Sequence, residues 1–104
     1  MVTEFVKVAE LGDLQDREMR FVEVGDERIV VARVGENYLA FSDECTHAWG
    51  SLSDGDLEGE RVTCPLHGSV FNIRTGEVVE DPAEEPIKVY PVMVAGNEIR
   101  VAVG

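Results

Sequence analysis

The chain has 104 residues, of which 44% are hydrophobic and 29% are charged, a mixture typical of one folded domain. Its 21 acidic and 9 basic residues give a net charge of −12, which opposes binding to nucleic acid or to an anionic membrane surface. We therefore expect a single domain over residues 1–104, with a basic docking face on any protein partner.

The N-terminal segment lacks the features of a targeting sequence. It has no basic stretch followed by an apolar run, and no window of the chain approaches the length of a membrane span. We expect a cytoplasmic, unanchored monomer. In that compartment two cysteines indicate metal binding or redox chemistry before a structural disulfide.

Short apolar runs alternate with turn residues along the whole chain, and no segment keeps a helical period. A turn with at most one loop of helix is expected at 11–16, and hairpin turns are expected around Gly25–Glu27 and Thr75–Gly76. The sequence predicts strands within 6–8, 19–24, 28–34, 38–41, 61–63, 70–73, 77–79, 87–94 and 99–103.

Four finer features complete this all-β prediction. Ile29–Ala32 is apolar on both faces, which indicates a central, buried strand. Leu57–Glu60 is read as a turn, and Asp81–Pro86 as an acidic loop without strand character. Pro91 cannot donate to a ladder, so it should mark an edge or a bulge of the last hairpin. We expect an antiparallel β-sandwich or barrel body from 1–41 and 87–104, which carries a small metal-binding subdomain from about 42–86.

Both cysteines and both histidines of the chain fall into two short motifs. The first motif is Cys45-Thr46-His47, and the second is Cys64-Pro65-Leu66-His67. Each motif pairs one thiol with one imidazole. Because the residues between them can form a hairpin, its two ends would bring the motifs face to face and build one metal centre.

Three arrangements compete for these four side chains. A Cys₂His₂ zinc site usually pairs cysteine with cysteine and histidine with histidine, whereas both pairs here are mixed. A disulfide between Cys45 and Cys64 would leave the histidines unexplained. A [2Fe–2S] cluster with two thiolates on one iron and two imidazoles on the other suits mixed pairs, since each loop can give one ligand to each iron.

The two motifs resemble the paired boxes of Rieske-type [2Fe–2S] ferredoxins. The resemblance extends to Leu52–Gly55 between the boxes and to Phe71–Asn72 and Thr75–Gly76 after them. It implies the Rieske fold and one [2Fe–2S] cluster. By this resemblance Cys45 and Cys64 bind the inner iron, and His47 and His67 bind the outer, more exposed iron.

Other positions distinguish subtypes within this resemblance. Respiratory-type Rieske proteins carry an extra cysteine in each box, but the neighbouring residues here are Gly50 and Leu66, and Phe71 stands where those proteins have tyrosine. The chain therefore resembles the soluble ferredoxins that serve oxygenases. Secondary roles are expected at four residues. The Ser69 hydroxyl is expected to bond to a cluster sulfur or to its own turn, and Pro65 to stiffen the second loop. Pro82 is expected to cover the cluster, and Trp49 to shield the cluster or to lie on the docking surface.

No catalytic residues remain once the cluster ligands are assigned. With both histidines used, no pair is left for a mononuclear iron site, and the chain has no dinucleotide fingerprint. The resemblance implies an electron-transfer component, not an enzyme, which passes single electrons from a flavin-dependent NAD(P)H reductase to a terminal, Rieske non-haem iron oxygenase. The alternatives are a Rieske small subunit of a larger enzyme, such as a nitrite reductase, and a structural zinc module.

Overall fold

The computed structural model describes residues 4–46, 50–66, 68–81 and 83–103. Within these ranges the only helices are two single-turn 3₁₀ segments, η1 (Leu11–Asp13) and η2 (Leu52–Asp54), and no helix is long and apolar enough to span a membrane. The strands are β1 (Glu4–Glu10), β2 (Met19–Val24), β3 (Glu27–Val34), β4 (Asn37–Ser42), β5 (Asp56–Glu58), β6 (Arg61–Thr63), β7 (Val70–Asn72), β8 (Val78–Glu80), β9 (Val89–Tyr90), β10 (Val92–Ala95) and β11 (Glu98–Val103).

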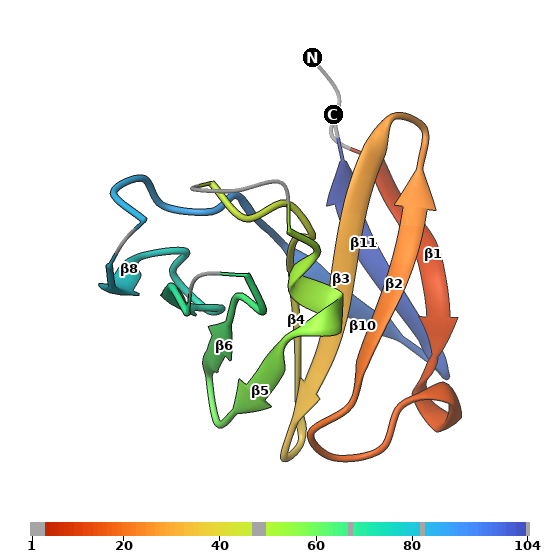
Figure 1. The fold of residues 1–104 in the computed structure, drawn as a ribbon. Helices are drawn as coiled ribbons and strands as arrows, with labels where there is room; N and C mark the ends of the chain where they lie inside the picture. The colour runs from red at the N-terminus through yellow and green to blue at the C-terminus, as the bar shows by residue number, and fades with distance from the viewer. Residues whose placement is uncertain (1–3, 47–49, 67, 82, 104) are drawn as a thin grey trace.

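Two antiparallel sheets form the body of the molecule (Figure 1). One has the order β1-β11-β10, and the other has the order β2-β3-β4-β9. The turn between β2 and β3 pairs Val24 with Glu27, and Gly25 enters it at a φ of 60°, a conformation that glycine adopts without a Cβ clash. The all-β prediction and its antiparallel body are confirmed.

Strand β3 lies between two separate apolar cores. Ile29 and Val31 belong to the body core, which also takes Ile99 from β11. The alternate residues Val30 and Ala32 belong to a second core. All four of these β3 side chains are fully buried, as expected for a central strand with apolar residues on both faces. One strand therefore supports both halves of the molecule.

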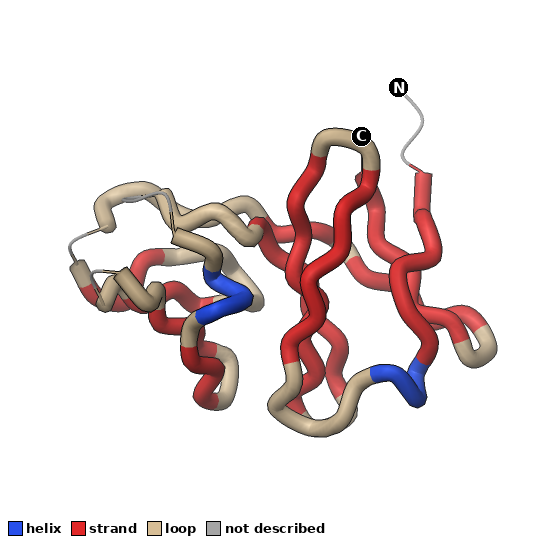
Figure 2. The backbone as a smooth tube through the Cα atoms, turned by 45° about the vertical axis from the view of Figure 1, so that its right-hand side comes forward, coloured by secondary structure: helices blue, strands red, loops and turns tan. Residues whose placement is uncertain are grey.

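A third sheet, of order β5-β6-β7-β8, lies beside the body (Figures 1 and 2). We call the segment from 43 to 88, which contains this sheet and the two cysteine loops, the ligand lobe. Its four strands have three residues each. The second core joins this lobe to the body, since Phe71 and Leu52 pack in it with Val30 of β3.

Two sequence predictions were wrong in detail. Leu57, predicted in a turn, lies in β5, where it pairs with Val62 across a hairpin that turns at Gly59. The predicted strand 87–94 is divided by Pro91 into β9, which pairs with β4, and β10, which pairs with β11. Because proline lacks an N–H group, the ladder is interrupted there and the chain crosses from one sheet to the other.

Candidate metal centre

The first cysteine loop leaves the body at the end of β4. Cys45 is 6% exposed, and its backbone N–H donates to the carbonyl of Gly50 at 3.1 Å. Glu44 and Ser51 form an antiparallel bridge just outside this bond. The two sides of the loop are thus held together at its base.

The second cysteine loop begins directly after β6. Cys64 is 1% exposed, and its N–H donates to the carbonyl of Ser69 at 2.8 Å, while its own carbonyl accepts from Gly68 N–H at 3.1 Å. Gly68 has a φ of 78°, in the left-handed region that favours glycine. This tight turn holds Pro65 and Leu66 at its exposed tip.

The two loops contact each other at Gly50. A Cβ atom at this position would lie 3.1 Å from Cys64 Sγ and equally close to the Leu66 side chain. The absence of a side chain therefore lets the first loop approach the second thiol. Gly50 was recognised in the sequence only as the position without an extra cysteine, and its role in this close approach was missed.

The two cysteines fit a cluster that takes one thiolate from each loop. Both lie in the core shared by the lobe and the body, and the structure, which describes both, does not join them in a disulfide. Buried cysteine thiols on two neighbouring loops are the donors that iron–sulfur clusters require. A disulfide between Cys45 and Cys64, the alternative considered from the sequence, is absent from the described structure.

The other predicted ligands fall outside the described residues. His47, His67, Trp49 and Pro82 all lie in the gaps between the described ranges. Within those ranges no group of three or more His, Cys, Asp or Glu side chains is placed to hold a metal ion. The pairing of the two thiols with two imidazoles accordingly stays a prediction.

The acidic loop after β8 is fastened to both cysteine loops. Thr46 Oγ1 donates to the Glu85 carbonyl at 2.7 Å, and Ser69 Oγ accepts from the Ala83 N–H at 3.0 Å. As predicted, this loop has no strand in its described part. The sequence indicated its acidity but not these bonds, because Thr46 and Glu85 are 39 positions apart.

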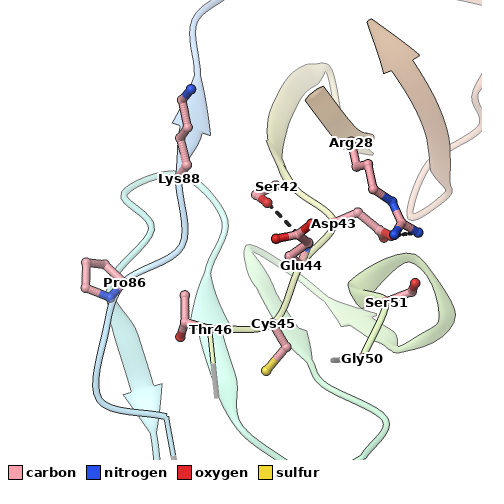
Figure 3. Close-up of a pocket in the computed structure, with 10 residues that line it drawn as sticks. All are labelled: Arg28, Ser42, Asp43, Glu44, Cys45, Thr46, Gly50, Ser51, Pro86 and Lys88. Atoms are coloured by element: carbon pink, nitrogen blue, oxygen red, sulfur yellow. Dashed lines mark hydrogen bonds and ion pairs between the residues drawn. The ribbon is translucent and has the colours of Figure 1, made fainter. Parts of the chain in front are cut away.

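A pocket of about 590 Å³ lies on the body side of the first loop (Figure 3). Arg28 reaches it from β3, and Lys88 reaches it from the end of the ligand lobe. Each is paired with a carboxylate: Arg28 Nη2 lies 3.5 Å from Asp43 Oδ2, and Lys88 Nζ lies 3.2 Å from Glu27 Oε1. The lining residues are Arg28, Ser42, Asp43, Glu44, Cys45, Thr46, Gly50, Ser51, Pro86 and Lys88. Sequence reasoning did not single out Asp43 or Arg28.

Glu27 is also bonded to Tyr90, on another strand of the same body sheet. The Tyr90 hydroxyl donates to Glu27 Oε2 at 2.8 Å, and this bond, followed by that from Lys88, lowers the pKa of the Glu27 carboxyl below its usual range. Burial first, and then the same hydrogen bond to Glu27, raises the pKa of Tyr90. Both shifts favour the pair as it stands at neutral pH, a carboxylate with a neutral phenol.

Comparison with known proteins finds relatives that match more than nine-tenths of the chain. The family model described as Rieske [2Fe-2S] domain matches residues 4–91. Ferredoxin CarAc of Metapseudomonas resinovorans is 39% identical over 99 residues, 94% of this chain and 92% of that protein. The ferredoxin component of biphenyl 2,3-dioxygenase from Rhodococcus jostii (strain RHA1) is 39% identical over 95 residues, 91% of this chain and 89% of that protein.

A solved structure gives the same result. A chain in the complex of reduced oxygenase and oxidized ferredoxin in carbazole 1,9a-dioxygenase matches with a TM-score of 0.90 and 39% identity, over 94% of this chain and 92% of that chain. The sequence motifs, the three-sheet fold and the buried cysteine pair agree with these matches. This chain belongs to the Rieske [2Fe–2S] domain family.

Proposed function

We propose that this chain is a one-electron carrier, which receives electrons from a flavin-dependent NAD(P)H reductase and passes them to a terminal oxygenase. One observation carries the proposal: two buried cysteines stand on two touching loops, in a fold shared with ferredoxin components of dioxygenase systems. When bound, a [2Fe–2S] cluster supplies the chemistry, since it takes up and releases a single electron. The chain itself is no enzyme but a component of a multicomponent system.

We assign Cys45 and Cys64 as the ligands of one iron, and His47 and His67 as the ligands of the other. The burial of both thiols supports the inner position for the cysteine iron. Neutral imidazoles in place of two thiolates make the second iron easier to reduce than one in an all-cysteine site. Pro65, in the turn that follows Cys64, fits the proposed stiffening of the second loop.

Ser69 is the proposed hydrogen-bond donor to a cluster sulfur. Its side chain is fully buried, and its Oγ accepts the Ala83 N–H, fourteen residues further along the chain, at 3.0 Å. That bond uses a lone pair of the hydroxyl oxygen and leaves the hydroxyl proton as a donor. A bond to a cluster sulfur would stabilise the reduced state and raise the potential. The bond to Ala83 crosses to another loop and differs from the local turn bond that the sequence also allowed.

Net charge and exposed apolar surface support docking of a partner protein on the part of the ligand lobe that carries Leu66. The chain carries −12 overall, and five of its nine cationic side chains, Lys7, Arg28, Arg74, Lys88 and Arg100, are paired with its own carboxylates. Leu66, beside the second ligand position, is 56% exposed. We infer a partner surface that is basic around an apolar centre, in reductase and oxygenase alike. Neither nucleic acid nor a membrane surface fits this charge.

We further propose that the protein works as a cytoplasmic monomer. Cysteines that are proposed as iron ligands suit a compartment that keeps thiols reduced. Sedimentation of the iron-loaded protein tests the oligomeric state, and fractionation of the cells that make it tests the location.

Reconstitution tests the electron-carrier role. With a flavoprotein reductase and a terminal oxygenase, NAD(P)H-dependent product formation should require this protein; equal turnover without it overturns the role. Metal analysis should give about two irons and two acid-labile sulfides per chain. One zinc per chain would support a structural module instead, and permanent co-purification with a larger enzyme would support a Rieske small subunit.

Variants test the ligand assignment. His67→Ala, like His47→Ala, should abolish or alter the visible absorption of the cluster, because one iron loses an imidazole. The matched control is Glu84→Ala, an exposed carboxylate of the acidic loop, which should keep the cluster and change at most the affinity for a partner. An unchanged spectrum in both histidine variants would contradict the assignment.

A further inference from the structure

Asp43 is a buried acidic side chain outside the proposed ligand set. It directly follows β4, two positions before Cys45, and is 1% exposed. A carboxylate removed from water is costly unless hydrogen bonds and an opposite charge compensate for it. Its partners therefore indicate what this residue holds in place.

The partners of Asp43 lie on two different elements. Its Oδ1 accepts the Ser53 N–H at 2.8 Å. Its Oδ2 lies 3.5 Å from Nη2 of Arg28 on β3 (Figure 3). Its backbone makes the same two connections, since its N–H donates to the Arg28 carbonyl at 3.0 Å and its carbonyl accepts from Leu52 N–H at 2.7 Å. Asp43 thus ties β3 to η2.

These bonds close the first cysteine loop at its base. The loop runs from Glu44 to Ser51, which are bridged to each other, and η2 follows immediately. Cys45 is bonded to Gly50 within the loop, and Gly50 stands against Cys64 Sγ. A shift between β3 and η2 at Asp43 would therefore move Cys45 and Gly50 together, relative to Cys64.

We propose that Asp43 is a positioning residue for the cluster: its carboxylate locks the base of the first cysteine loop to β3 and η2 and so sets the approach of Cys45 to Cys64. The inference rests on the proposed function only in that Cys45 and Cys64 are taken as iron ligands. Arg28, whose guanidinium also lies 5.3 Å from the centre of the Phe21 ring, is the cation that balances the buried carboxylate.

The first part of the test compares four variants of the iron-loaded protein. Asp43→Ala removes the lock, whereas Asp43→Asn keeps an oxygen that can still accept the Ser53 N–H. Arg28→Met removes the cation while retaining a long side chain over Phe21. Glu44→Ala is the matched control, because it removes an exposed carboxylate of the same loop, one residue nearer to Cys45.

The first readout is the rate at which visible absorption bleaches in the presence of an iron chelator. Asp43→Ala should bleach roughly tenfold faster than the parent protein, since hydrogen bonds to a charged group are lost at the base of the loop. Arg28→Met should be intermediate, Asp43→Asn should be largely rescued, and Glu44→Ala should stay within about twofold. If Asp43→Ala cannot be prepared with iron, the comparison of Arg28→Met with Glu44→Ala still decides, since equal bleaching rates of these two variants overturn the inference.

The second readout separates positioning from general stability. Asp43→Ala should change the electron-paramagnetic-resonance line shape of the reduced protein, whereas Val31→Ala, which weakens the body core, should leave it unchanged. Bleaching of Asp43→Ala equal to that of Glu44→Ala, or a spectrum identical to the parent's, overturns the inference. A parent protein that holds no two-iron cluster overturns the proposed function instead.

Discussion

The two faces of β3 are covered by cores that differ in what completes them. On one face Ile29 and Val31 meet an assembly of aliphatic side chains and Tyr90 between the two body sheets. On the other face Val30 and Ala32 meet the core of the ligand lobe, which includes both cysteines. Apolar burial alone can stabilise the first core, whereas the second contains two thiols whose proposed role is to bind iron.

The strands of the body and those of the ligand lobe also differ in length. Body strands extend to eight residues in β3 and seven in β1, but β5, β6, β7 and β8 have three residues each. Strands of this length bury little surface on their own, and small units of structure are often stabilised by a metal. We infer that the body can hold its fold without iron and that the lobe depends on it.

The largest effect should come from removing a thiol. In Cys64→Ser, iron loss should lower the amide protection of β5–β8 by about 100-fold, because the metal no longer ties the lobe together, while β3 and β11 keep most of theirs. Hydrogen-exchange mass spectrometry measures both regions at once. Chelation of the parent protein should reproduce the pattern, and an equal loss in body and lobe would contradict the division.

A pair of neighbouring valines offers a finer comparison. Val30 and Val31 are both fully buried on the same strand but face different cores. In the iron-loaded protein, Val30→Ala and Val31→Ala should each lower the free energy of unfolding by about 2 kcal/mol, through lost burial and a residual cavity.

Iron removal should separate these two variants. Without iron, Val31→Ala should still lower the free energy of unfolding by about 2 kcal/mol. The loss caused by Val30→Ala should fall to about half, since the loosened lobe no longer packs tightly against the face of β3 that carries Val30. Urea denaturation of both variants and the parent, with and without iron, gives the four differences in the free energy of unfolding. Equal costs in all conditions would mean that the lobe core survives intact without its metal.

Much of this division could be predicted from the sequence because it depends on local signals. The apolar run Ile29–Ala32 predicted a strand buried on both faces, and the period-two pattern of 99–103 predicted the face of β11 that enters the body core. The spacing of Cys45 and Cys64 predicted two loops that meet, which agrees with the contact between Gly50 and Cys64.

The remaining features depend on contacts between distant segments. Leu57 became part of a strand because Val62 and the rest of β6 pair with it, although its own neighbourhood is rich in turn residues. Pro91 was expected at an edge or a bulge of the last hairpin, but it separates two sheets, because β4 pairs with the residues before it and β11 with those after it. In the sequence Asp43 looks like any loop carboxylate, because its partners Arg28 and Ser53 come close to it only in the folded chain.

The pair formed by Tyr90 and Glu27 should make a smaller contribution, confined to the body. Tyr90→Phe should lower the free energy of unfolding by about 1 kcal/mol at neutral pH, because one hydrogen bond to a carboxylate is lost. Tyr38→Phe is the matched control, since Tyr38 lies on the same sheet with Arg33 over its ring.

The pH dependence of this pair has a definite sign. The pKa of Tyr90 is raised in the folded protein, so its contribution is complete below about pH 10, where unfolded tyrosine begins to ionise, and is lost as the pH rises through the folded value. The pKa of Glu27 is lowered, so its contribution is present above about pH 4.3 and is lost as the pH falls through the folded value. The difference between Tyr90→Phe and the parent should shrink at both extremes, and a constant difference would contradict the coupling.

The smallest effect should come from the turn that precedes β2, far along the chain from the lobe. Arg17 has a φ of 68°, where side chains other than glycine are strained, and its N–H donates to the Arg33 carbonyl at 2.8 Å. Arg17→Gly should stabilise the protein by about 0.5 kcal/mol, because relief of the strain slightly exceeds the added entropy of the unfolded chain. Arg20→Gly, within β2, removes the same charge from an extended residue and should destabilise by about 1 kcal/mol.

Thermal unfolding of these two variants in the iron-loaded and iron-free protein completes the comparison. Because Arg17 is bonded to Arg33, near the C-terminal end of β3, and is not among the residues of the lobe core, the gain in stability should be the same in both states. A gain that disappears with the iron would mean that the body turn and the lobe unfold as one unit, and the body could then no longer be regarded as a scaffold that stands without its metal.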